Sequence, residues 1–383
     1  MTITKNARNA EYVKEYNRKK FIGLLRQAPM SRADAARHLG ITRAAISLIA
    51  EAMIEEGLIR EIPPEEVSNP SSRGKPPIPL TLVPDSLYAV GINISRGAST
   101  AGLVNICGTV INSIDIKVHH DGDQIHALER TVRRLISDAN VPWEKIVGIG
   151  ISAPGPLDGE NGVILNPPNF RLWQNLRISE PLEAALGIPV YLENDASSLA
   201  RYQLGKPQAH GSEDFLLLKI SNGVGSGVIS RGKLLKGAGY FTTELGHSSI
   251  DYAGKPCSCG NRGCLETYAS MENLLEDTPY SSWQEVVDRS RTEPDASALI
   301  SLEFDYLTAA ICNLTAIVPI DTVLMAGDLA HRAKDTAPLL EQKINQHLLR
   351  RNNLPIRVYP AYAGADPFIN SAADIAFGRF LLM

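Results

Sequence analysis

The chain has 383 residues, 44% of them hydrophobic, which is enough for two or three folded domains and excludes an intrinsically disordered protein. No stretch reaches about 18 uninterrupted apolar residues and the N-terminal segment is polar and charged, so we expect neither a membrane span nor a signal peptide and predict a cytoplasmic protein. The formal net charge is −4, but residues 1–80 hold 13 Lys and Arg against 9 Asp and Glu, so a mildly basic head precedes an acidic body.

The basic head is predicted to contain three helices followed by two short strands. Ser31 and Thr42 are good N-caps for the second and third helices, and Gly40 and Gly57 end these helices. The charge bias indicates a nucleic-acid contact at this end of the protein, although chance asymmetry would also produce it. The predicted elements are helices over 10–27, 31–38 and 42–56 and strands over 58–60 and 78–83, which enclose a tip rich in Gly and Pro.

The second and third helices have the spacing of a helix-turn-helix. Ala36 lies where the two helices would cross closely, and Gly40 lies where the turn requires a positive φ. Ile46 and Ile49 share one face of the third helix, which leaves the opposite face free to enter a major groove, with Arg43 as the reader of guanine. The alternative is a helical dimerisation head with no DNA role. The candidate DNA-binding residues are Thr42, Arg43, Ala44, Ser47 and Leu48 on the helix, with Arg73 and Lys75 at the wing tip.

From about residue 84 the pattern changes to apolar, strand-like runs that alternate with helical segments. This alternation is typical of α/β domains with mainly parallel sheets. The predicted strands cover 87–94, 99–104, 110–118, 146–151, 190–192, 215–220, 228–230, 323–325 and 356–360, and the clearest helices cover 125–139 and 303–317.

Five cysteines are present, and Cys257, Cys259 and Cys264 lie within eight residues of one another. In a cytosolic protein, so tight a cluster indicates a metal site before it indicates disulfides. Three free thiols in a loop, or redox-active disulfides, are the alternatives.

The cysteine cluster belongs to a longer motif: Gly246-His247, nine residues, and then Cys257-Ser258-Cys259-Gly260-Asn261-Arg262-Gly263-Cys264-Leu265-Glu266. This motif resembles the signature of the ROK family, named for repressors, open reading frames and kinases. The resemblance runs from about Asn17 to the C-terminus. Together with the helix-turn-helix, it is similar to the repressor branch, which includes the bacterial regulators of xylose, glucose and N-acetylglucosamine use.

The resemblance implies an α/β fold in which a winged helix-turn-helix precedes a two-lobed, actin-like or hexokinase-like (ribonuclease H-like) body of the ATPase type. The implied domains are the DNA-binding head with its wing and linker at 1–83, a first lobe at 84–195 and a second lobe at 196–383. The second lobe carries the cysteine loop, and its C-terminal helix is expected to return to the first lobe.

His247 adds an imidazole to the three thiolates, and this ligand set suits one closed, tetrahedral, structural Zn²⁺ ion per chain. The ligands are predicted to be His247, Cys257, Cys259 and Cys264. The metal is expected to hold the loop that presents Glu266 and to take no part in chemistry.

A sugar site is predicted where Glu193-Asn194-Asp195 follows an apolar strand, since α/β sheets place ligand groups at strand carboxyl ends. In the kinases that the chain resembles, the residue matching Asp195 is the base that deprotonates the sugar. The run Thr242-Thr243 departs from the small residues usual in the family. Phe170 and Trp173 are expected to line the pocket, where an aromatic ring can stack on a pyranose. The resemblance implies sugar ligands at Asn194, Asp195, Glu244, His247 and Glu266, and Asn169 in the loop near Phe170 is predicted to join them.

The nucleotide site of the family's kinases is degenerate in this chain. The first phosphate hairpin, Asp-x-Gly-Gly-Thr in the kinases, is reduced to Asn93, Ser95, Arg96 and Gly97, so its acid and its Thr are missing. The third phosphate motif ends in Asp328, whose charge would repel phosphate. Since phosphoryl transfer depends on positioning and on charge neutralisation, we expect no catalytic residues and no kinase activity.

The sequence therefore predicts a sugar-responsive transcriptional regulator, more often a repressor than an activator in such proteins. Its expected partners are a double-stranded DNA operator, a sugar or sugar phosphate effector, and a second copy in a homodimer, with a tetramer as the larger alternative. Two other hypotheses stay open: a bifunctional sugar kinase with a regulatory head, and a regulator controlled by a protein partner.

Overall fold

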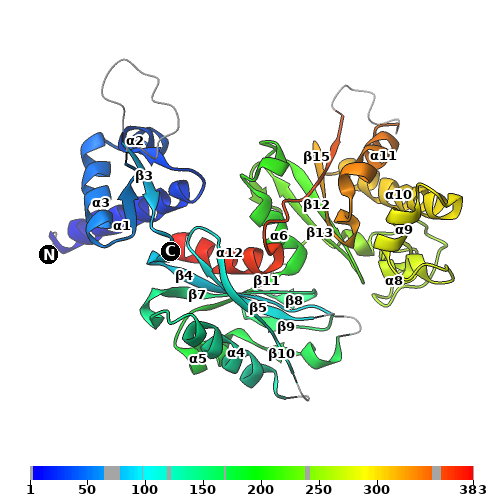
Figure 1. The fold of residues 1–383 in the computed structure, drawn as a ribbon, viewed down its shortest axis with the longest axis horizontal. Helices are drawn as coiled ribbons and strands as arrows, with labels where there is room; N and C mark the ends of the chain where they lie inside the picture. Colours follow the sequence, from blue (N-terminus) through cyan, green and yellow to red (C-terminus); the bar gives the residue numbers. More distant parts are fainter. Residues whose placement is uncertain are drawn as a thin grey trace.

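The computed structural model describes residues 3–63, 78–96, 98–118, 122–167, 170–237, 242–346 and 355–382. A helical head lies at one end, and two α/β lobes follow it, with the C-terminal helix α12 running between the head and the lobes (Figure 1). Within these ranges, no helix has the length and apolar character that a membrane crossing requires.

The head is a winged helix, as its turn residues predict. The Ser31 and Thr42 side chains accept hydrogen bonds from the amides of Asp34 and Ala45, both at 3.2 Å, and so cap the second and third helices. Gly40 adopts φ of 66° in the turn between them. The elements are α1 (Ile3–Leu25), β1 (Met30–Ser31), α2 (Arg32–Leu39), α3 (Arg43–Glu55), β2 (Ile59–Glu61) and β3 (Pro79–Leu82), with the strands in the order β1-β3-β2.

The described strands of the first lobe form a five-stranded sheet in the order β11-β7-β4-β5-β6, in which β4, β7 and β11 are parallel. The strands are β4 (Tyr88–Asn93), β5 (Thr100–Asn105), β6 (Val110–Asp115), β7 (Ile146–Ala153) and β11 (Val190–Asn194). Helices α4 (Gln124–Asp138) and α5 (Ser179–Leu186) cover one face of the sheet and α12 covers the other (Figure 1). A small sheet, β8 (Leu157–Asp158), β9 (Val163–Ile164) and β10 (Leu176–Arg177), lies beside them.

The second lobe has a sheet in the order β14-β13-β12-β15-β16. Its strands are β12 (Phe215–Ile220), β13 (Val224–Ser230), β14 (Lys233–Leu234), β15 (Thr322–Gly327) and β16 (Arg357–Pro360). Its helices are α6 (Asp195–Gln203), α7 (Glu266–Ala269), α8 (Met271–Leu275), α9 (Trp283–Arg289), α10 (Pro294–Thr315) and α11 (Ala333–Asn345).

Two second-lobe elements are longer than the sequence pattern indicates. Strand β13 begins at Val224, four residues before the expected start, because the glycine-rich segment pairs with β12 along its whole length. Helix α10 begins at Pro294, and Pro is well tolerated at the first position of a helix. Short 3₁₀ turns connect the larger elements at Pro84–Ser86, Trp143–Lys145, Arg171–Trp173, Pro207–Ala209, Leu245–His247 and Asp328–Ala330.

Helix α12 (Pro367–Leu382) packs directly on the first-lobe sheet. A Cβ atom at Gly91 would lie 2.2 Å from the carbonyl oxygen of Ile369, and one at Gly150 would lie 1.9 Å from that of Ala372. Only glycine fits at these two strand positions, so the helix backbone rests on the strands themselves.

An adjoining face of α12 contacts the head. The Arg26 guanidinium donates to Asp374 at 2.8 Å and to the Ile106 carbonyl at 3.0 Å, and it lies 4.6 Å from the ring centroid of Phe377. Phe21 on α1 belongs to the same buried apolar cluster as Phe377. The head therefore docks on the body through both an ion pair and a shared core.

Candidate functional site

A cavity of about 450 Å³ lies between the two lobes, where several strands end. Asn93, Asn194 and Ser221 line it at the carboxyl ends of β4, β11 and β12, and Asp328 lines it just beyond β15. This is the edge at which open α/β sheets bind ligands. Both lobes therefore contribute walls to one site.

The structure brings the predicted sugar ligands together, apart from Asn169, which lies outside the described residues. Asn194 caps helix α6 by accepting from the Ser197 amide at 3.0 Å, and this fixes the neighbouring Asp195 at the first position of the helix. Their sugar-binding role itself stays a prediction. The cavity-lining members of the set are Asn194, Asp195, Glu244, His247 and Glu266.

Two carboxylates of this set, Asp195 and Glu266, act on a third, Glu244. Solvent reaches part of the Glu244 side chain, yet the surrounding walls desolvate its carboxyl group and, with Asp195 and Glu266 nearby, raise its pKa to about 7. Glu266 accepts a hydrogen bond at 2.9 Å from the amide of Val224, so it is tied to the glycine-rich loop of the second lobe. This wall of the cavity is therefore acidic.

Lys219, Asp366 and Phe368 are among the cavity residues that sequence reasoning missed. The Lys219 ammonium forms an ion pair with Asp195 and lies 5.4 Å from the ring centroid of Phe368. One signal was available, because Lys219 is the only charged residue in the otherwise apolar strand β12. No local sequence pattern indicates Asp366 or Phe368. These two residues line the cavity because the start of α12 lies beside it.

The aromatic residues expected to stack on a sugar lie elsewhere, and this expectation is wrong. Phe170 and Trp173 are 7% and 4% exposed and stack on each other, with ring centroids 6.2 Å apart, in the core of the first lobe. Neither lines the cavity. Packing in the protein core removes both rings from water, so no ligand is needed to cover them.

The residues that the sequence analysis aligned with the phosphate loops of the kinases contact other parts of the cavity lining. Arg96 donates to the carbonyl of Asn222 at 3.2 Å, and this contact joins the first-lobe hairpin to the second-lobe loop. A Cβ atom at Gly223 would lie 3.0 Å from the Arg96 guanidinium and 2.9 Å from the Glu266 carboxylate. Asp328 accepts from Gln284 at 3.1 Å. Gly97 lies outside the described residues.

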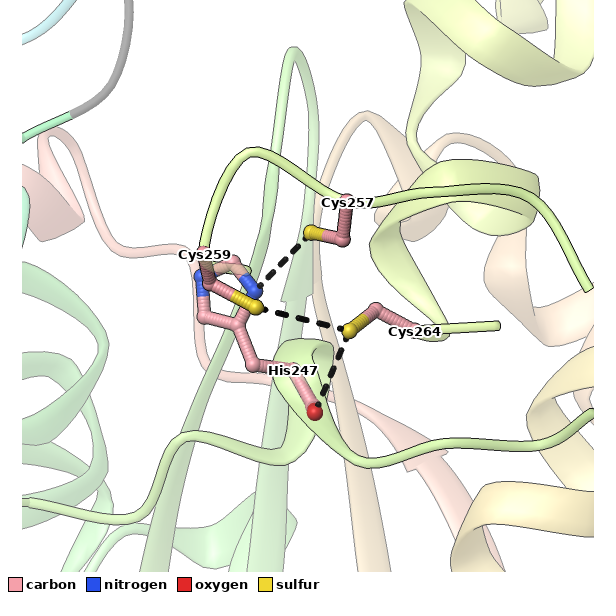
Figure 2. A group of neighbouring side chains, drawn as sticks. All are labelled: His247, Cys257, Cys259 and Cys264. Carbon is pink, nitrogen blue, oxygen red and sulfur yellow. Dashed lines mark hydrogen bonds between the residues drawn. The ribbon is translucent and has the colours of Figure 1, made fainter. Parts of the chain in front are cut away.

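The four predicted metal ligands form one compact group, with their ligand atoms all within 4.8 Å of one another (Figure 2). Cys257 Sγ lies 3.6 Å from His247 Nδ1, and Cys259 Sγ lies 3.7 Å from Cys264 Sγ. The corners of a tetrahedral site with zinc-like bond lengths are about 3.5–3.8 Å apart. The group can therefore hold a tetrahedral metal ion with little movement.

Without a bound metal ion, Cys264 is a neutral thiol. Burial, together with the neighbouring thiols Cys259 and Cys257, raises the pKa of Cys264 to about 12. A metal ion reverses this preference, because it binds the thiolate and displaces the proton. His247 both belongs to this group and lines the cavity, so the two sites share one imidazole.

The candidate DNA-binding face of α3 is open to solvent. Thr42, Arg43 and Ala44 are exposed, Ser47 is half-buried and Leu48 is 66% exposed. Ile46 and Ile49 on the opposite face are buried in the head. The predicted exposure of this face is confirmed, whereas its contact with DNA stays a prediction. Arg73 and Lys75 lie outside the described residues.

These features define a two-lobed α/β body with an interlobe cavity and a docked winged-helix head. Residues 90–376 match the ROK family, and the chain belongs to this family. It is 27% identical over 381 residues to the xylose repressor of Bacillus subtilis, with 97% of each chain covered. It is 29% identical over 250 residues to the DNA-binding transcriptional repressor Mlc of Escherichia coli, covering 65% of this chain and 61% of that repressor.

Solved structures agree in fold. A ROK family transcriptional regulator described as a homologue of E. coli Mlc is 25% identical, with a TM-score of 0.78 over 97% of this chain and 98% of that one. A ROK hexokinase from Thermus thermophilus is 28% identical, with a TM-score of 0.64, and covers 76% of this chain while 99% of the hexokinase is matched. A complete kinase thus corresponds to only part of this protein.

Proposed function

We propose that the protein is a sugar-responsive transcriptional repressor that binds an operator of a carbohydrate-use operon through its winged-helix head. One observation carries the proposal: helix α12 contacts both the ligand cavity and the DNA-binding head. Phe368 near its start lines the cavity, whereas Asp374 and Phe377 hold Arg26 of the head. A ligand that favours one arrangement of the lobes would therefore shift the position of the head.

The operator contact is proposed for Thr42, Arg43, Ala44, Ser47 and Leu48, with Arg73 and Lys75 on the wing. A bidentate contact from Arg43 to guanine would supply specificity, and the wing lysine and arginine would contact the backbone or minor groove. A homodimer would present two heads to two half-sites, whose spacing is geometrically strict. Such a regulator works in the cytoplasm, where its operator lies. The repressor assignment is supported by the relatives that match almost the whole chain.

The effector is proposed to bind between the lobes, against Asn169, Asn194, Asp195, Glu244, His247 and Glu266. One structural Zn²⁺ per chain, on His247, Cys257, Cys259 and Cys264, would hold the loop that leads into Glu266. With Nδ1 directed toward the thiols, the other ring nitrogen of His247 is left for the sugar.

Sugar kinase activity is the second candidate function, since the family includes kinases such as the T. thermophilus hexokinase. The residues that align with the phosphate loops of the kinases argue against this activity. Arg96 is bonded to the Asn222 carbonyl where a kinase would need open backbone amides, and Asp328 adds a negative charge. Loss of one electrostatic group costs enzymes about 2.7–4 kcal/mol of transition-state stabilisation. We therefore propose that phosphoryl transfer is absent.

Capture of genomic fragments by the purified protein, followed by release with a panel of sugars, tests the function. We expect specific fragments beside a sugar-use operon, released by one sugar. Arg43→Ala should lower operator affinity roughly 10- to 100-fold, whereas Arg134→Ala on the exposed face of α4 should leave it unchanged. Failure to capture any specific fragment, together with turnover of ATP and sugar, would identify a kinase instead.

A further inference from the structure

An ion pair between Lys219 and Asp195 lines the cavity, and no sequence pattern predicts it. The Lys219 ammonium on β12 contacts one oxygen of Asp195, and the other oxygen accepts from the Ala196 amide at 2.7 Å. The two side chains are 16% and 12% exposed, yet both line the cavity. The Phe368 ring packs on the ammonium. The pair is therefore held in place and borders the cavity.

The two members of this pair have opposite hydrogen-bonding capacity. An ammonium only donates, an ionised carboxylate only accepts, and a hydroxyl group does both. A sugar hydroxyl placed against Lys219 and Asp195 can accept from the first and donate to the second. A deoxy position would leave both groups without a ligand partner. A phosphate ester at that position has no proton to donate when ionised, and it would lie against the Asp195 carboxylate.

The other charges of the cavity strengthen the discrimination against phosphate. Lys219 and Arg96 are the cations of the lining. One N–H group of Arg96 donates to the Asn222 carbonyl, and its Nε has no hydrogen-bond partner among the described residues. Five carboxylates outweigh these two cations, so a phosphate dianion would enter a site whose net charge is negative. The carboxylates that line the cavity are Asp195, Glu244, Glu266, Asp328 and Asp366.

We propose that Lys219 is a specificity-determining residue, which with Asp195 reads one free hydroxyl of the effector and excludes the sugar phosphorylated at that hydroxyl. The inference rests on the proposed function and narrows it, because it assigns an unphosphorylated sugar to the cavity. Sites built to hydrogen-bond a hydroxyl reject analogues without it by on the order of 10⁴-fold or more when fully enclosed. This cavity is open on one side, so we expect a smaller factor, of about 100-fold.

Isothermal titration of the full-length protein tests the proposal with D-glucose, D-mannose, N-acetyl-D-glucosamine and N-acetyl-D-mannosamine, each beside its 6-phosphate. We expect one free sugar to bind and its 6-phosphate to bind at least about 100-fold more weakly. Lys219→Met should lower the affinity for the free sugar at least about tenfold, and Lys219→Arg should restore part of this affinity. Lys233→Met, an exposed lysine on β14, is the matched control and should change nothing.

Asp195→Asn provides the sharpest readout, because it removes the charge but keeps an acceptor for the Ala196 amide. Asp195→Asn should lower the affinity for the free sugar and raise the affinity for the 6-phosphate about tenfold or more. A variant that fails to fold would lose affinity for both ligands. A 6-phosphate that binds the wild type as tightly as the free sugar would overturn the inference and leave the proposed function standing. If neither these sugars nor any other sugar of the panel used for operator release binds protein that still binds its operator, the sugar-binding function fails and this inference fails with it.

Discussion

Replacement of Glu244 by Gln will remove the response to sugar while operator binding persists. Glu244 lines the cavity and lies far along the chain from the head, so the change deletes a charged acceptor for sugar hydroxyls without touching α3. Loss of a hydrogen bond to a charged group costs about 1.5–3 kcal/mol, or roughly 10- to 100-fold in sugar affinity. Operator titrations by fluorescence anisotropy, with and without sugar, measure both quantities. Glu272→Gln, an exposed residue of α8, is the matched control.

The same residue gives the response a pH dependence of known sign. The pKa of Glu244 is raised to about 7, so the carboxyl group of the ligand-free protein takes up a proton as the pH falls through this value. Sugar hydroxyls donate to the ionised form, and sugar affinity should therefore fall below pH 7, by about tenfold at pH 6. Glu244→Gln should show no such fall. Wild-type affinity that stays flat between pH 8 and pH 6, or an undiminished sugar response in Glu244→Gln, would contradict the assignment.

Replacement of Cys264 by Ser will release the metal and unfold the loop around it. We expect about one zinc per wild-type chain, since the His247 and cysteine group matches a closed tetrahedral site. Cys264 is fully buried, so its loss leaves a polar hydroxyl in place of a metal ligand and lowers the thermal midpoint by several degrees or more. Sugar binding should also weaken, because Glu266 follows two residues later.

Elemental analysis and thermal melts measure this outcome directly. Cys107→Ser is the matched control, because Cys107 is an exposed free thiol outside the group. It should keep its zinc and its melting temperature. Well-folded wild-type protein that is purified without chelators and contains no metal would show that the four residues are a thiol cluster and not a metal site.

The sequence predicts the parts of this protein whose physics is local. Ser31, Gly40 and Thr42 define the turns of the head because caps and positive φ depend on one residue and its neighbours. The cysteine cluster is equally predictable from the sequence, since three of its ligands lie within eight residues. The interlobe cavity is expected from the resemblance to the ROK family, and the family match confirms that resemblance.

The remaining features depend on contacts between distant segments. Lys219 meets Asp195 only after β12 pairs in the second sheet and α6 packs across it, and α12 brings Phe368 to the same place. The aromatic rings of Phe170 and Trp173 suit a sugar chemically, but the first-lobe core buries them. A composition-based argument cannot decide between core and ligand for such rings, because both environments favour the same side chains.

The central claim is that sugar binding in the cavity and operator binding by the head are thermodynamically coupled. The most direct measurement is the sugar's Kd for the free protein and for the protein saturated with operator, set beside the operator's Kd with and without sugar. Coupling is reciprocal, so the account predicts that operator weakens sugar binding by the same factor by which sugar weakens operator binding, typically about 5- to 150-fold. Equal sugar affinity in the free and operator-bound protein would contradict the account.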